Sequence, residues 1–171
     1  MFDPLKNQPN IAPPAHVREA ETMRVSRATF DEVMFQTYVP AQFVPVRAAG
    51  SRIWDTEGKD YVDLAGGVAV LSLGHCHPAL NAALKAQADR MWHISNYMVN
   101  EPAMRLAKKL VDATFADRVF LCNSGTEANE GALKTARKYA STKYGEQKHR
   151  IISTTNSFHG RTWLAVSTGG S

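Results

Sequence analysis

Residues 119–130 read VFLCNSGTEANE, and this stretch decides the fold of the region around it. It begins with a short apolar run, which predicts a buried strand over 119–122. The Ala-rich residues 128–143 predict a helix, and apolar runs at 150–153 and 162–167 predict two further strands. Because strand, helix and strand follow one another, the sequence predicts a βαβ unit with a parallel sheet and therefore an α/β fold.

The residues before this stretch predict short helices, one hairpin and one irregular passage. Cap residues and apolar spacing predict helices over 26–36, over 78–92 and from Asn100 onward. Two β-prone runs around a polar, Gly-containing turn predict a hairpin over 52–63. The Gly-interrupted apolar residues 64–73 predict a tight backbone passage rather than regular structure.

The composition is that of an ordinary globular protein, with 171 residues, 44% of them hydrophobic and 21% charged. Lys and Arg number 20 against 16 Asp and Glu and never form a run, so we expect no nucleic-acid partner. Two cysteines exclude a disulfide scaffold. No segment approaches the ~20 apolar residues of a membrane span, and the N-terminus lacks a secretory signal. These features predict a cytoplasmic protein without a membrane partner, with a flexible extension over residues 1–25.

A candidate phosphate site lies at the predicted junction of strand and helix, at Ser124-Gly125-Thr126. The first N–H groups of a helix have no partners within the helix, and the helix dipole adds partial positive charge there. Gly125 lets an anion approach the backbone closely, and the two hydroxyls can add hydrogen bonds. The alternative is a capping box between Ser124 and Glu127, and the motif by itself fits this alternative better.

A second candidate site is the loop Ser157-Phe158-His159-Gly160-Arg161, which follows a predicted strand. In open α/β sheets, ligands bind beyond the carboxyl ends of the strands. Phe158 could stack on a flat ring there, and Arg161 could bind a carboxylate through two hydrogen bonds. The alternative is a phenylalanine in the core beside a surface arginine.

Two other features leave their roles open or favour a plain structural role. His75-Cys76-His77 has a spacing too tight for zinc patterns and no matching second pair, so we interpret it as a turn before Pro78 and expect no metal site. Tyr38 fits a core position and a position facing a substrate equally well.

Taken together, several segments resemble acetylornithine and succinylornithine aminotransferases, which are class III aminotransferases that depend on pyridoxal phosphate. The resemblance runs from about residue 25 to residue 171. The segments that carry it are SRATFDE (26–32), GSRIWD (50–55), DLAGGVAV (63–70), LGHCHP (73–78), WHISN (92–96), NEP (100–102), NSGTEANE (123–130) and SFHGR (157–161).

The resemblance implies fold type I, in which residues 26–75 would belong to the small domain and residues 76–171 to the first part of the large domain that binds pyridoxal phosphate. It also implies a homodimer. Residues 66–70 would line the pocket near the substrate. The individual site residues that the resemblance implies are Ser124, Gly125 and Thr126 for the cofactor phosphate, Phe158 for the pyridine ring, and Arg161 and Tyr38 for the substrate.

The resemblance further implies a reaction that moves the distal amino group of an N-acylornithine to 2-oxoglutarate and releases glutamate. Family members are more than twice as long as this chain. The lysine that forms a Schiff base with the cofactor would lie beyond Ser171, so we expect no catalytic residue within the chain. Two alternatives stay open: an inactive or merely phosphate-binding relative, and a transaminase for another ω-amine such as ornithine or 4-aminobutyrate.

Overall fold

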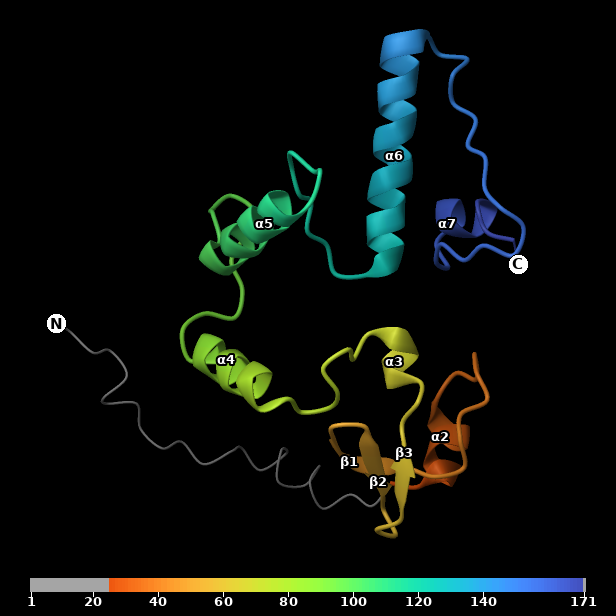
Figure 1. Cartoon of the computed structure of the whole chain (residues 1–171). Helices are drawn as coiled ribbons and strands as arrows, with labels where there is room; N and C mark the ends of the chain where they lie inside the picture. Colours follow the sequence, from red (N-terminus) through yellow and green to blue (C-terminus); the bar gives the residue numbers. More distant parts are fainter. Residues whose placement is uncertain (1–24, 171) are drawn as a thin grey trace, which may run out of the picture. The chain divides into compact units, whose positions relative to one another are not determined.

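The computed structural model describes residues 25–170 (Figure 1). Contacts divide the chain into two compact units, with the boundary between Trp92 and His93. The predicted extension over residues 1–25 lies outside the described residues except for Val25, and the predicted domain segments stay a prediction. The elements are α2 (Arg27–Val33), β1 (Pro45–Ala49), β2 (Arg52–Asp55), β3 (Asp60–Val62), α3 (Gly66–Ala69), α4 (Pro78–Ala88), α5 (Glu101–Ala113), α6 (Gly125–Tyr144) and α7 (Trp163–Ser167).

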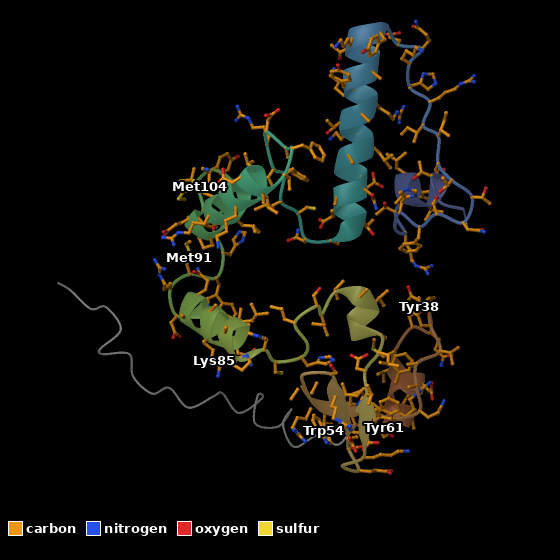
Figure 2. The ribbon with its side chains drawn as sticks, viewed as in Figure 1. Tyr38, Trp54, Tyr61, Lys85, Met91 and Met104 are labelled. Atoms are coloured by element: carbon orange, nitrogen blue, oxygen red, sulfur yellow. The ribbon has the colours of Figure 1, made fainter. Side chains whose placement is uncertain are left out.

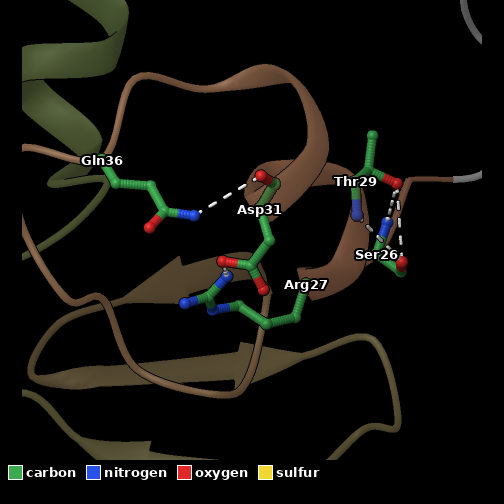
Figure 3. Close-up of polar contacts among 5 residues, drawn as sticks. All are labelled: Ser26, Arg27, Thr29, Asp31 and Gln36. Carbon is green, nitrogen blue, oxygen red and sulfur yellow. Dashed lines mark hydrogen bonds and ion pairs between the residues drawn. The ribbon is translucent and has the colours of Figure 1, made fainter.

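Helix α2 of the first unit begins with a complete capping box (Figure 3). The backbone N–H of Thr29 donates to the Ser26 hydroxyl, and the backbone N–H of Ser26 donates to Oγ1 of Thr29 at 3.1 Å. Arg27, the first residue of the helix, forms an ion pair with Asp31 one turn later. The helix predicted to begin at Ser26 is therefore confirmed, although it is shorter than expected.

The predicted hairpin over 52–63 is confirmed as the antiparallel pair of β2 and β3, and β1 adds a third strand beside β2. Asp55 organises the turn between β2 and β3, because its carboxylate accepts the N–H groups of Glu57 and Lys59 and the hydroxyl of Tyr61, all within 2.9 Å. Tyr61, labelled in Figure 2, stacks on Phe43 with 4.1 Å between the ring centroids.

The charge of Asp55 predicts a pH dependence of this hairpin. Burial raises the pKa of Asp55, but the three hydrogen bonds together outweigh it and lower the pKa below the ordinary 3.8. A lowered carboxyl pKa stabilises the fold above the unfolded pKa, and this contribution is lost as the pH falls through the folded pKa. We expect amide protection factors over 52–62 to decrease below pH 3.8 in hydrogen exchange.

Two variants test this pH dependence. Asp55→Asn should abolish it, whereas Asp60→Asn, which removes only an exposed ion pair with Arg52, should preserve it. Equal pH profiles for Asp55→Asn and the unmodified chain would contradict the role of Asp55.

The predicted tight passage after the hairpin contains one left-handed turn, α3. All four residues of α3 have positive φ values, including 64° at the β-branched Val68. Asp63 holds the entry to this turn, because its carboxylate accepts the N–H groups of Ala65 and Gly66 and lies 2.6 Å from Nε2 of His75. The hydrogen bond with His75 is the largest cause of a lowered pKa at Asp63.

The predicted helices from Pro78 and from Asn100 are confirmed as α4 and α5. Asn100 caps α5 by accepting the N–H of Ala103 at 3.1 Å. In the second unit, α6 and α7 pack together, and Ala165 of α7 is fully buried; it is the one buried hydrophobic side chain among residues 25–170. No described helix is long and apolar enough to cross a membrane.

Three strand predictions are wrong in this structure. Residues 119–122 and 150–153 form no regular strand, and 163–167 are helix α7. Between residues 25 and 170 the sheet is the antiparallel β1-β2-β3, so the predicted parallel βαβ unit is not formed there. A strand forms only against a hydrogen-bonded neighbour, and these apolar runs have none among the described residues. Phe120 and Ile152 are accordingly exposed, at 74% and 98%.

Candidate functional site

Helix α6 begins at the candidate phosphate motif, and its cap involves Ser124. The Ser124 hydroxyl accepts the N–H of Glu127 at 3.1 Å and donates to the Glu127 carboxylate at 3.2 Å. The same carboxylate accepts the backbone N–H of Asn123 at 2.8 Å. Hydrogen bonds from Asn123 and Ser124 outweigh burial and lower the pKa of Glu127. The capping interaction weighed as the alternative is therefore present, and binding of a phosphate by Ser124 stays a prediction.

The next two residues leave donors available for an anion. Within the described residues, no acceptor takes the backbone N–H groups of Gly125 and Thr126, and the Thr126 hydroxyl makes no hydrogen bond. The space beside Gly125 is open, since an added Cβ would meet nothing within 4 Å. Free N–H groups and the positive end of the dipole of a 20-residue helix make this position chemically suited to a phosphate.

The loop of the second candidate site lies against the first two turns of α6. The side-chain amide of Asn129 donates to the carbonyl oxygen of His159 at 2.8 Å. Gly160 is buried and has φ of +124°, and a Cβ added there would lie 2.3 Å from Oγ1 of Thr126. The structure therefore brings together the two predicted segments, although about thirty residues separate them in sequence.

The two side chains predicted to recognise ring and carboxylate flank this contact. Phe158 is 70% exposed, so the alternative of a core phenylalanine is wrong for this structure. The Arg161 guanidinium lies 5.8 Å from the centroid of the Phe158 ring. His159 lies between these two residues in sequence, and its Nδ1 atom is buried without a hydrogen-bond partner in the described region.

Sequence reasoning missed the residues that hold this loop. Glu130 accepts hydrogen bonds from the Thr162 hydroxyl and, at 3.3 Å, from the backbone N–H of Ala165, so that its carboxylate lies at the N-terminus of α7. Asn129 and Glu130 follow Thr126 by three and four residues, which places all three on one face of α6. This helical spacing is the feature of the sequence from which a shared role of the three residues could have been predicted.

The remaining predicted residues belong to the first unit. Tyr38 follows α2 and is 63% exposed (Figure 2). His75 is paired with Asp63, and its backbone forms a bridge with Gly50, as suits the predicted turn before Pro78. Over residues 25–170, no group of three or more His, Cys, Asp or Glu side chains could hold a metal ion.

The start of α6 is suited to a phosphate, and an aromatic side chain and an arginine lie on the loop beside it. Comparison with known families shows to which class of protein the chain belongs. The family model described as Aminotransferase class-III matches residues 33–171. The chain therefore belongs to the class III aminotransferases, a family that depends on pyridoxal phosphate.

Within this family, the chain is similar to enzymes named for two amine donors. The chain is 61% identical over 150 residues to acetylornithine aminotransferase of Pseudomonas putida, covering 88% of this chain and 37% of that protein. It is 61% identical over 149 residues to succinylornithine transaminase of Salmonella typhimurium, covering 87% and 36%. The chain thus spans little more than a third of the length of these relatives.

A solved structure extends the comparison to the fold. Ornithine aminotransferase of Toxoplasma gondii, in a crystal structure with partial occupancy of PLP at its active site, matches with a TM-score of 0.76 and 31% identity. The match covers 91% of this chain and 38% of that chain. The predicted class, an α/β protein of fold type I and part of a longer aminotransferase fold, is therefore confirmed at the level of the family.

Proposed function

We propose that this chain contributes the phosphate site, the ring-stacking aromatic and a carboxylate anchor to an aminotransferase that acts on N-acetylornithine or N-succinylornithine, with 2-oxoglutarate as acceptor and glutamate as product. The observation that carries the proposal is the contact between the start of α6 and the loop of Phe158 and Arg161. The identity of 61% to enzymes named for these two amine donors supports the choice of substrate.

The residues present fit pyridoxal phosphate. The N–H groups of Gly125 and Thr126 and the Thr126 hydroxyl would bind its phosphate, since they have no other acceptor in the described structure. Ser124 would support this site while it caps α6. Phe158 would cover one face of the pyridine ring. When bound, the cofactor supplies an electron sink conjugated to the amine-bearing carbon of the substrate.

The arginine would orient the substrate. N-acylornithines and 2-oxoglutarate all carry carboxylates, and a guanidinium binds a carboxylate through two parallel hydrogen bonds. Arg161 would hold such a carboxylate beside Phe158, which leaves the distal amine as the reacting end. Tyr38 would contact the substrate, and residues 66–70 would line its pocket. The Schiff-base lysine is expected outside residues 1–171.

We further propose that the enzyme works in the cytoplasm as a homodimer. Cys76 and Cys122 are both free and exposed, which suits a reducing compartment. Residues 94–100 resemble a family segment that lies at the dimer interface near the active site, and Tyr97 and Val99 within it are 97% and 78% exposed. Exposed apolar side chains in such a segment are what a dimer interface would bury.

The test of the proposed reaction is a panel of amine donors with the complete enzyme that carries this chain. N-acetylornithine and N-succinylornithine should give the highest kcat/KM with 2-oxoglutarate, ahead of ornithine and 4-aminobutyrate. A higher kcat/KM for either of the last two would replace the proposed substrate class with another ω-amine.

The phosphate site makes a separate prediction. Thr126→Val keeps the shape of the side chain but removes its hydroxyl, so we expect the Kd for pyridoxal phosphate to rise about tenfold. Absorbance titration of the apo-enzyme measures this. Thr114→Val is the matched control, since the Thr114 hydroxyl also makes hydrogen bonds, to the Leu110 carbonyl and from the backbone N–H of Ala116, but lies at the end of α5. Equal cofactor retention by Thr126→Val and the unmodified enzyme would count against the phosphate site.

A further inference from the structure

Two neighbouring side chains of α6 form hydrogen bonds with the chain on both sides of Arg161, the last residue of the loop 157–161. Asn129 donates to the carbonyl oxygen of His159, two residues before Arg161, at 2.8 Å. Glu130 accepts from the Thr162 hydroxyl, which directly follows Arg161, and from the N–H of Ala165 at 3.3 Å. Both side chains are partly buried against the loop.

The same helix carries the candidate phosphate donors. Thr126, Asn129 and Glu130 lie one turn apart on one face of α6, and buried Gly160 closes the contact by lying against Thr126. Within the described residues of this unit, α6 and α7 are the helices that pack together. The Ser157 end of the loop is tied to residues after α7, since its hydroxyl donates to the Thr168 carbonyl at 3.4 Å and its carbonyl accepts the Gly170 N–H at 2.9 Å, whereas the Arg161 end is tied to α6. The distance between the N–H groups of Thr126 and the side chains of Phe158 and Arg161 therefore depends on Asn129 and Glu130.

We propose that Asn129 and Glu130 are positioning residues that hold the loop of Phe158 and Arg161 against α6. The two loop side chains then lie at a fixed distance from the phosphate donors of α6. This inference rests on the proposed function, and it assigns roles to two residues that touch neither cofactor nor substrate themselves. The phosphate would be held by α6 alone, whereas the orientation of the ring and of the substrate would depend on the loop. Loss of either side chain should therefore disturb the orientation of the cofactor ring while leaving the affinity for the phosphate nearly unchanged.

The experiment compares Asn129→Ala, Glu130→Ala and Glu130→Gln in the complete enzyme. Three quantities are measured: the Kd for pyridoxal phosphate, the visible circular dichroism per bound cofactor, and kcat with N-acetylornithine. We expect the two alanine variants to lose about tenfold in kcat and about half of the dichroism, with a change in Kd below about threefold. Glu130→Gln keeps an acceptor oxygen for Thr162 and Ala165 and should behave like the unmodified enzyme.

Asn81→Ala is the matched control for Asn129→Ala. Asn81 also donates from its side-chain amide to a backbone carbonyl, that of Cys76 at 3.5 Å, but it lies on α4 in the other unit. This control should leave all three quantities unchanged. Hydrogen exchange adds a readout without cofactor: the amides of 159–165 should exchange faster in both alanine variants and normally in Glu130→Gln.

The outcomes separate the two proposals. Parallel losses of cofactor affinity and kcat in Asn129→Ala, or no change in any quantity, would overturn the positioning role. If Asn129→Ala does not fold, the pair Glu130→Ala and Glu130→Gln decides, and equal behaviour of these two would also overturn it. An unmodified enzyme that binds no pyridoxal phosphate would refute the proposed function instead, and the exchange measurement would still report whether the loop is attached to α6.

Discussion

Replacing Gly160 by alanine is expected to weaken binding of pyridoxal phosphate by about a hundredfold or more. The φ of Gly160 is +124°, which disfavours any residue with a Cβ, and the new Cβ would lie 2.3 Å from Oγ1 and 2.7 Å from Cγ2 of Thr126. Rotation of the Thr126 side chain would not relieve this collision, because the new Cβ would also lie 2.8 Å from Cβ of Thr126, which the first turn of α6 holds in place. The collision would therefore disturb the first turn of α6, which carries the proposed phosphate donors, in addition to pushing the loop with Phe158 away.

An absorbance titration with the cofactor, together with the melting temperature, measures this effect. Gly58→Ala is the matched control: Gly58 also has a positive φ, +82°, but an added Cβ meets nothing within 4 Å. It should therefore show the backbone strain without the collision. If Gly160→Ala retained the affinity of the Gly58→Ala control, the contact between Gly160 and Thr126 could not be what holds the site together.

Arg161→Ala should lower kcat/KM for N-acetylornithine by about a hundredfold to a thousandfold, because a charged bidentate hydrogen-bonding partner of the substrate is lost. The Kd for pyridoxal phosphate should stay nearly constant, since the proposed phosphate donors belong to α6. Arg161→Lys should recover only part of the loss, because an ammonium is a point charge without the planar fork of a guanidinium.

The measurement is steady-state kinetics with two donors, N-acetylornithine and an alkylamine that has no carboxylate. Only the first should suffer in Arg161→Ala. Arg150→Ala, which changes an exposed arginine earlier in the same segment, serves as the control and should be neutral. Equal losses with both donors would show that Arg161 supports the site in some way other than binding a carboxylate.

Local chemistry was predicted well from the sequence. The caps at Ser26, Asn100 and Ser124 were predicted because an N-cap needs only a short polar side chain and the N–H groups of the next turn. The hairpin over 52–63 was predicted from two β-prone runs around a Gly-containing turn, and the structure shows that Asp55 holds this turn from within the same few residues.

The strand predictions failed where the outcome depends on distant residues. Residues 162–167 have the apolar character of a strand, but Glu130 accepts N–H and O–H groups at the start of this segment and stabilises the helix α7 there. Residues 119–122 have the pattern of a buried strand, yet Phe120 lies against Gly131 of α6 instead of within a ladder. Propensity describes such a segment alone, whereas its state is set by the partners it finds.

The sequence by itself determined the family and the two segments of the candidate site, because short motifs such as NSGTEANE and SFHGR carry their chemistry in adjacent residues. Only the tertiary structure decided that these segments meet, through the bond from Asn129 to His159 and the close approach of Gly160 to Thr126. Contacts across about thirty residues depend on the path of the backbone between them, and no local pattern of residues encodes that path.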